Sequence, residues 1–122
     1  MRSEIAATQS GGALGWLLQR FTGALLAVLL LTHFFVTHFS AGGDRSFQQV
    51  SARLHQPLWQ AAERLFLAAA LWHGGYGLWL MIQDYVSNSL ARLILLMALW
   101  TVGAVAFVLG WLTIIALGGP AR

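Results

Sequence analysis

Charged side chains divide this chain of 122 residues into polar ends and long uncharged runs. The three longest runs hold 23, 19 and 29 residues and lie between Arg20 and Asp44, between Arg64 and Asp84, and between Arg92 and Arg122. A helix rises about 1.5 Å per residue, so about 20 apolar residues cross a hydrocarbon core of about 30 Å. The pattern therefore predicts three transmembrane helices.

The uncharged runs and their flanking residues set the expected elements. We expect a single all-α domain over residues 1–122, with helices at about 16–39, 57–86 and 92–117. The segment at 40–56 is polar and is expected to be a loop. The first apolar run is too long for a typical signal-peptide core, so we expect it to remain as a membrane helix.

The expected loop contains apolar residues at helical spacing, Phe47, Val50 and Leu54. This spacing predicts a short amphipathic helix at the membrane surface. Three spans put the N-terminus and the loop on opposite sides of the membrane. The arginines divide almost evenly between these sides, so the positive-inside rule gives no orientation.

Composition supports a membrane protein and excludes several other classes. Hydrophobic residues make up 58% of the chain and charged residues only 9%, which leaves no room for a separate soluble domain. The net charge of +3 comes from scattered arginines, which argues against nucleic-acid binding. Cysteine is absent, so this chain cannot hold an iron–sulfur cluster through thiolates. Any such cluster must belong to a partner.

His73 lies near the middle of the second uncharged run. A bilayer disfavours charge, so we expect a neutral imidazole there, which can bind a metal such as haem iron. Gly74, Gly75 and Gly77 follow it and remove side chains where a flat porphyrin can approach the helix. The alternative is that these glycines permit close helix packing and that His73 makes one hydrogen bond between helices.

Asp84 and Tyr85 follow His73 by 11 and 12 residues. Eleven residues turn a helix by about 1100°, so Asp84 returns to the His73 face about 16 Å along the axis. A phenol and a carboxylate at interfacial depth suit the carbonyl groups of a quinone with its tail in lipid. The alternative is that both residues only end the helix, with Asp84 paired to Arg20 or Arg92.

Two further residues of the first helix can take part in such a site. Arg20 can bind a quinone oxygen, a haem propionate, Asp84 or a lipid phosphate, and we expect it on the membrane face of Asp84 and Tyr85. His33 lies at a depth close to that of His73, so the two rings can face each other across a haem. A plain polar contact between helices explains His33 equally well.

The string HGGYGLWLMIQDYV in the second helix resembles the membrane-anchor D subunit of succinate dehydrogenase, the succinate:quinone oxidoreductase of respiratory complex II. That family shows a histidine, a glycine four residues later and an Asp–Tyr pair after 11 and 12 residues, which are here His73, Gly77, Asp84 and Tyr85. The sister C subunit follows its glycine with an Arg–His pair, which this chain lacks. The D type is therefore favoured.

The resemblance implies a role for each candidate residue. His73 would be an axial ligand of haem b, and the second ligand would come from a C-type cytochrome b subunit. Tyr85 would hydrogen-bond a quinone oxygen, Asp84 would position water or arginines, and Arg20 would lie near the quinone pocket or a propionate. His33 departs from the best-known members with one haem, so its contact with a haem stays open.

The resemblance also implies the protein's partners and location. The three helices would form half of a haem-containing helix bundle with the C-type subunit, and would anchor an iron–sulfur subunit and a flavoprotein subunit. The chain would lie in the inner (cytoplasmic) membrane with its N-terminus in the cytoplasm, and would help transfer electrons from succinate to quinone without being catalytic alone. The alternatives are a quinol:fumarate reductase anchor and a non-catalytic three-helix scaffold.

Overall fold

The computed structural model describes residues 12–39 and 46–119, and these residues form helices and no strands. In chain order the helices are α2 (Gly12–Phe39), α3 (Phe47–Leu54), α4 (Pro57–Tyr85) and α5 (Ser89–Gly118). The predicted all-α class with three long helices is confirmed. The predicted loop lies partly in residues 40–45, outside the described residues, and its remainder includes α3.

Two helices begin earlier than the charge pattern predicted, and each has a local cause. The prediction began the first helix at Trp16. In the structure α2 also includes the small residues before Trp16, and one of them, Gly15, packs against the Tyr76 ring of α4. At α5 the side chain of Asn88 accepts a hydrogen bond from the backbone N–H of Ala91 at 3.0 Å. This cap satisfies an otherwise unpaired N–H and sets the helix start.

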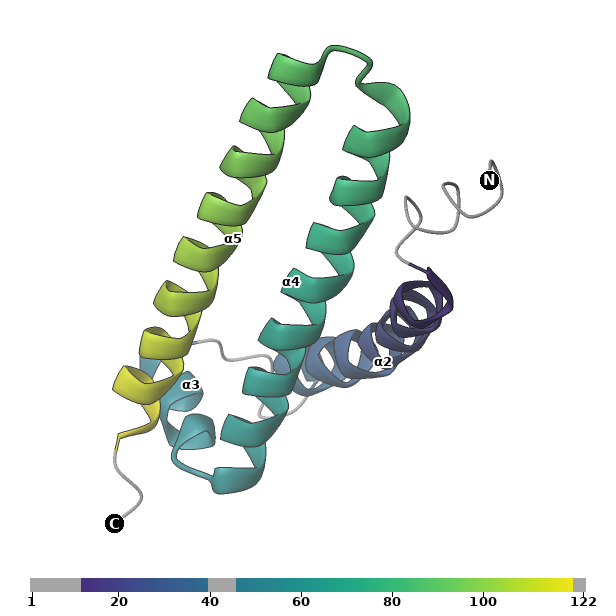
Figure 1. The fold of residues 1–122 in the computed structure, drawn as a ribbon. Coiled ribbons are helices and arrows are strands. Elements are labelled where there is room, and N and C mark those ends of the chain that lie inside the picture. Colours follow the sequence, from purple (N-terminus) through teal and green to yellow (C-terminus); the bar gives the residue numbers. More distant parts are fainter. Residues whose placement is uncertain (1–11, 40–45, 120–122) are drawn as a thin grey trace.

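The central element is α4, which contacts α2, α3 and α5. Figure 1 shows α4 and α5 as an antiparallel pair, while α2 is inclined to them and α3 lies across the lower end of the pair. The contacts of α2 with α4 extend from Gly15, which meets Tyr76, to His33, which meets Glu63. The register of α2 on α4 decides which polar residues of the two helices meet.

Glycine allows the α4–α5 pair to pack closely. A Cβ atom on Gly110 of α5 would lie 2.9 Å from both terminal methyl carbons of Leu67 on α4. A Cβ on Gly118 would lie 2.7 Å from the carbonyl oxygen of Leu54, at the end of α3. Small residues at these contacts let helices approach without the loss of packing that a larger side chain would impose.

The short helix α3 is fixed to the end of this pair. Ser46 caps its N-terminus by accepting from the N–H of Gln49, and Leu54 is only 7% exposed. The hydroxyl of Ser51 donates to the carbonyl of Leu117 in the last turn of α5 at 3.0 Å. The predicted amphipathic helix is thus confirmed as a helix, and it contacts the protein through its apolar side.

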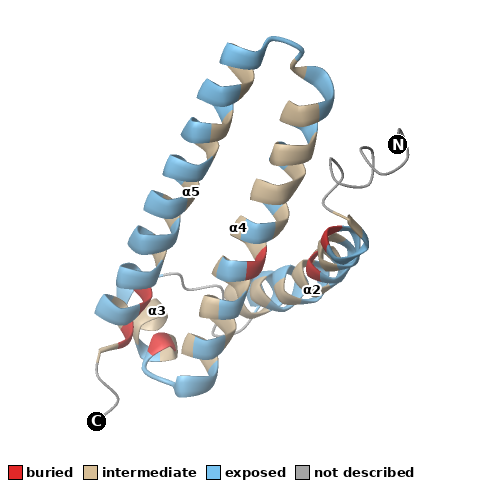
Figure 2. Ribbon diagram, viewed as in Figure 1, coloured by how far each residue is buried: buried red, intermediate tan, exposed pale blue. Residues whose placement is uncertain are grey.

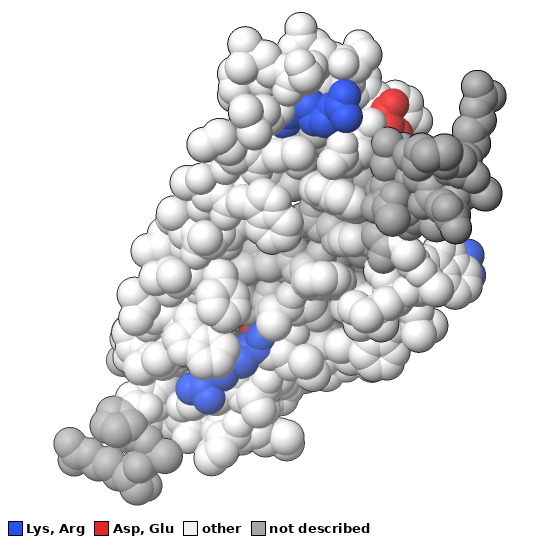
Figure 3. All heavy atoms as spheres, in the orientation of Figure 1, with Lys and Arg blue, Asp and Glu red and all other residues white. Residues whose placement is uncertain are grey.

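Most large apolar side chains point outward. Figure 2 shows few buried positions, and among the described residues the buried hydrophobic ones are Leu54, Ala69 and Ile114. The three long helices are apolar enough to cross a membrane, with mean hydropathy between 1.4 and 2.4 in their most apolar windows. Figure 3 shows a mainly uncharged surface on this face, with few charged groups. A surface of this kind is stable against lipid or partner helices.

The contact between Gly118 and Leu54 gives a test of this packing. Gly118→Ala places a methyl group against a backbone oxygen that cannot turn away, so we expect a destabilisation of about 1–3 kcal/mol. Gly103→Ala is the matched control, because no atom lies within 4 Å of a Cβ there. Thermal unfolding of the protein in detergent micelles, followed by circular dichroism, measures both; equal midpoints for the two variants would contradict the packing.

Candidate functional site

His73 points from α4 towards α2, where two oxygen atoms meet its Nδ1. The backbone carbonyl of Gln19 lies 3.2 Å away and the hydroxyl oxygen of Thr22 lies 3.3 Å away. The Thr22 hydroxyl donates its own hydrogen to the carbonyl of Leu18 at 2.7 Å. Because both neighbours of Nδ1 can then only accept, Nδ1 carries the proton and donates. Nε2 is left with a free lone pair.

The backbone around His73 is held from α2 as well. The side-chain amide of Gln19 donates from Nε2 to the carbonyl oxygen of His73 at 3.0 Å. A Cβ on Gly23 would lie 3.0 Å from Cε1 of the imidazole, so glycine lets the ring rest against α2. Thr22 is buried, with 9% of its surface exposed. Hence α2 fixes the orientation and the tautomer of His73.

This donor arrangement fits one axial position of a haem iron. Imidazoles that bind metals usually donate their other N–H to a carbonyl or carboxylate, which fixes the ring and strengthens the ligand nitrogen. His73 does so, and its Nε2 has no hydrogen-bond partner within residues 12–39 and 46–119. The same ranges contain no group of three or more metal-binding side chains.

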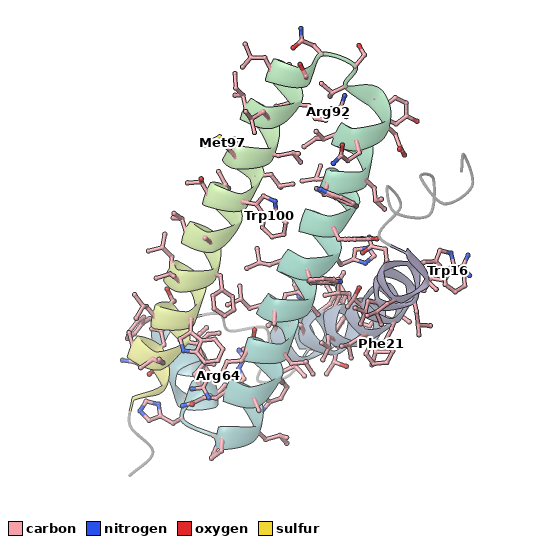
Figure 4. The ribbon with its side chains drawn as sticks, in the orientation of Figure 1. Trp16, Phe21, Arg64, Arg92, Met97 and Trp100 are labelled. Atoms are coloured by element: carbon pink, nitrogen blue, oxygen red, sulfur yellow. The ribbon has the colours of Figure 1, made fainter. Side chains whose placement is uncertain are left out.

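The glycines after His73 face different surroundings. Gly77 faces α2, where a Cβ would lie 3.3 Å from the amide nitrogen of Gln19. Gly74 and Gly75 have no atom within 4 Å of a Cβ, and they line an open groove of about 580 Å³ between α4 and α5. Trp100 extends from α5 into the same space (Figure 4). Close packing against α2 is thus confirmed for Gly77, whereas the approach of a porphyrin to the other two glycines stays a prediction.

Asp84 and Tyr85 are the last two residues of α4 and both are exposed, Tyr85 with 83% of its surface. The helix is continuous from His73, so Asp84 lies about 16 Å along the axis on nearly the same face. Within the described part of the chain Asp84 forms no ion pair. Its carboxylate and the neighbouring phenol are therefore accessible at one end of the helix.

Arg20 does not lie beside Asp84, contrary to the sequence expectation. Its guanidinium stacks over the ring of Trp16, 4.3 Å from the centroid, and Figure 4 shows Trp16 on the side of α2 away from α4. Its neighbour Gln19 contacts α4 at His73, so Arg20 lies at the level of the histidine. The expectation placed Arg20 level with Asp84, whereas the register of α2 on α4 places it near His73.

The alternative interpretation, an ion pair of Asp84 with Arg92, is not found among the described residues either. The Arg92 guanidinium lies 3.5 Å from the amide oxygen of Gln83 and 3.4 Å from the carbonyl oxygen of Ser87. These contacts hold the turn between α4 and α5. Arg92 thus supports the turn and leaves the carboxylate of Asp84 free for another partner.

His33 and His73 do not face each other. His33 Nδ1 lies 3.1 Å from a carboxylate oxygen of Glu63. The His33 ring stacks on the Phe66 ring, with the two centroids 5.8 Å apart. Glu63 precedes His73 by ten residues, which is about 15 Å along α4. The depth argument failed because it assumed another register of α2 against α4. Sequence reasoning missed Glu63 because it lies just outside the uncharged run that follows Arg64.

Comparison with known proteins agrees with this geometry. Residues 6–113 match the family model for the succinate dehydrogenase/fumarate reductase transmembrane subunit. Two relatives carry the name succinate dehydrogenase hydrophobic membrane anchor subunit. The protein of Archaeoglobus fulgidus is 35% identical over 71 residues, which cover 58% of this chain and 61% of that protein. The protein of Rickettsia felis is 29% identical over 108 residues, which cover 84% of this chain and 88% of that protein.

The family match covers most of the chain, including α2, α4 and the greater part of α5. The three long apolar helices are those of a multi-pass membrane protein. The chain therefore belongs to the succinate dehydrogenase/fumarate reductase transmembrane subunit family.

Proposed function

We propose that this chain is the membrane anchor of a succinate:quinone oxidoreductase, in which it binds haem b and forms part of the quinone-reduction site. The observation that carries the proposal is the hydrogen-bonded state of His73, whose Nδ1 is held by α2 while Nε2 keeps its lone pair. A neutral imidazole held in this way has one ring nitrogen available to a metal.

The proposed partners follow from what the chain lacks. With no cysteine it cannot carry an iron–sulfur cluster by thiolates, so an iron–sulfur subunit and a flavoprotein subunit deliver the electrons. His73 supplies one haem ligand, and a C-type cytochrome b subunit supplies the other. The outward-facing apolar side chains of the described helices leave extensive surface for these helices and for lipid. The membrane is the inner (cytoplasmic) one, with the N-terminus in the cytoplasm.

At the haem, the residues of this chain would bind the iron and orient the imidazole ligand. The iron, when bound, accepts and returns one electron at a time. His73 would hold the iron, and Gln19 and Thr22 keep the imidazole in the required tautomer. Arg20 lies at the same level of α2, which favours a haem propionate over a quinone oxygen as its partner. His33 is left out of this site because it meets α4 at Glu63, about 15 Å along the helix from His73.

At the quinone, the residues at the end of α4 move protons. Reduction of a quinone to a quinol takes two electrons and two protons. The phenol of Tyr85 donates a hydrogen bond to a quinone carbonyl oxygen, which stabilises the negative charge that develops there. Asp84 carries a carboxylate with no ion-pair partner among the described residues, so it can pass protons from water to the reduced oxygen atoms.

Replacement of the proposed haem ligand gives a direct spectroscopic test. His73→Ala removes Nε2, so the purified complex should lose the reduced b-type absorption band or shift it. The control is His38→Ala, because His38 lies on the exposed surface of α2 with its Nδ1 3.0 Å from the Phe34 carbonyl. An unchanged band in an assembled His73→Ala complex would refute the ligand assignment.

The role of Thr22 can be separated from that of the ligand itself. Thr22→Val keeps the side-chain shape but removes an acceptor at Nδ1, so haem affinity should fall about 10–100-fold, as for other residues that orient metal ligands. Thr32→Val is the matched control, since Thr32 bonds only the Val28 carbonyl among the described residues. Haem titration of the haem-depleted complex measures both; equal affinities would mean that Thr22 does not position the ring.

Tyr85 is tested by comparing two electron acceptors. Tyr85→Phe removes one hydrogen bond to the quinone, so quinone reduction should fall about tenfold, which corresponds to about 1.4 kcal/mol. Succinate oxidation by a water-soluble artificial acceptor should stay at the wild-type rate, because it bypasses the membrane site. If both activities fell together, Tyr85 would be acting on assembly and not on the quinone.

A further inference from the structure

A cavity of about 610 Å³ opens at the end of the molecule remote from Tyr85. It lies among the last turns of α2, the short helix α3, the first turns of α4 and the last turns of α5. Its walls are mainly apolar and include Leu30, Phe34, Val50, Leu54, Trp59 and Ile114. Neither Asp84 nor Tyr85 lines it, so it is separate from the proposed quinone site.

The cavity lies where a lipid headgroup would meet the protein. The helix ends around it are Phe39 of α2, Pro57 of α4 and Gly118 of α5. The amphipathic helix α3 joins these ends, and its residues Val50, Arg53 and Leu54 form one side of the cavity. A site that starts at helix ends and continues along apolar side chains has the layout of a membrane interface.

The arginine that lines the cavity, Arg53, forms no ion pair with the carboxylate that lines it, Glu63. Glu63 is bonded to His33 at 3.1 Å, and Nδ1 of His38 lies 3.0 Å from the carbonyl of Phe34. Arg53, in the last turn of α3, is half-buried, and its guanidinium has no hydrogen-bond or ion-pair partner in residues 12–39 and 46–119. A half-buried cation beside apolar walls is costly without an anion.

We propose that this cavity binds an anionic phospholipid, with the phosphate on Arg53 and an acyl chain against the apolar walls. The guanidinium fork matches two phosphate oxygens, and the charge of the ligand offsets that of Arg53. A neutral quinone would leave this charge uncompensated. A metal ion is disfavoured, because no group of three metal-binding side chains occurs within the described ranges.

The test compares lipid binding to the purified complex in micelles that contain equal amounts of phosphatidylglycerol and phosphatidylcholine. Native mass spectrometry measures how many molecules of each lipid stay bound. Arg53→Gln should lower the preference for phosphatidylglycerol about fivefold, the effect of one cationic side chain near an anionic headgroup. Arg53→Lys should keep most of the preference, and Arg92→Gln is the matched control, with the same charge removed from the opposite membrane face.

A second variant tests the apolar part of the site. Val50→Trp fills the cavity beside Arg53 and should reduce retention of both lipids at this site, while the charge stays in place. An undiminished phosphatidylglycerol preference in Arg53→Gln would overturn the proposal, as would equal losses in Arg53→Gln and Arg92→Gln. Displacement of the bound lipid by a short-chain quinone, but not by added phosphatidylglycerol, would assign the cavity to a quinone instead. The proposed function would be unaffected by any of these results.

Discussion

The contact of His73 Nδ1 with the Gln19 carbonyl and the Thr22 hydroxyl is the interaction on which the proposed chemistry depends. It forms because glycine at position 23 lets the imidazole rest on the backbone of α2. A hydrogen bond of this kind contributes about 1 kcal/mol to stability, but its larger effect is to fix which ring nitrogen is free. The contact between the two helices thereby leaves Nε2 of His73 available to the proposed haem.

The bilayer explains why so small a protein can fold with few buried residues. The described helices bury few residues, and their large apolar side chains face outward. Lipid and partner helices cover those side chains, so the chain needs no core of its own. Its internal contacts instead involve small residues where two helices meet. Examples are Gly110 against Leu67 and Gly118 against Leu54. Polar groups are then free to gather at two levels, around His73 and at the helix ends.

Much of the fold could be predicted from the sequence, because long stretches without charged residues directly indicate the transmembrane helices. The positions of His73, Asp84 and Tyr85 along one helix were also predictable, since helical rotation fixes their spacing. The register of α2 against α4 was not, because it depends on which glycines meet which rings. For that reason Arg20 lies near His73 and not near Asp84, and His33 pairs with Glu63, a residue just outside the uncharged run.

The most direct measurement is an experimental density map of the assembled complex that resolves the surroundings of His73. The arrangement in α2 and α4 predicts Nε2 within bonding distance of a haem iron, with Nδ1 still donating to the Gln19 carbonyl and the second axial histidine on another subunit. A ring turned towards lipid, or an Nε2 bonded to a protein group with no iron beside it, would contradict it.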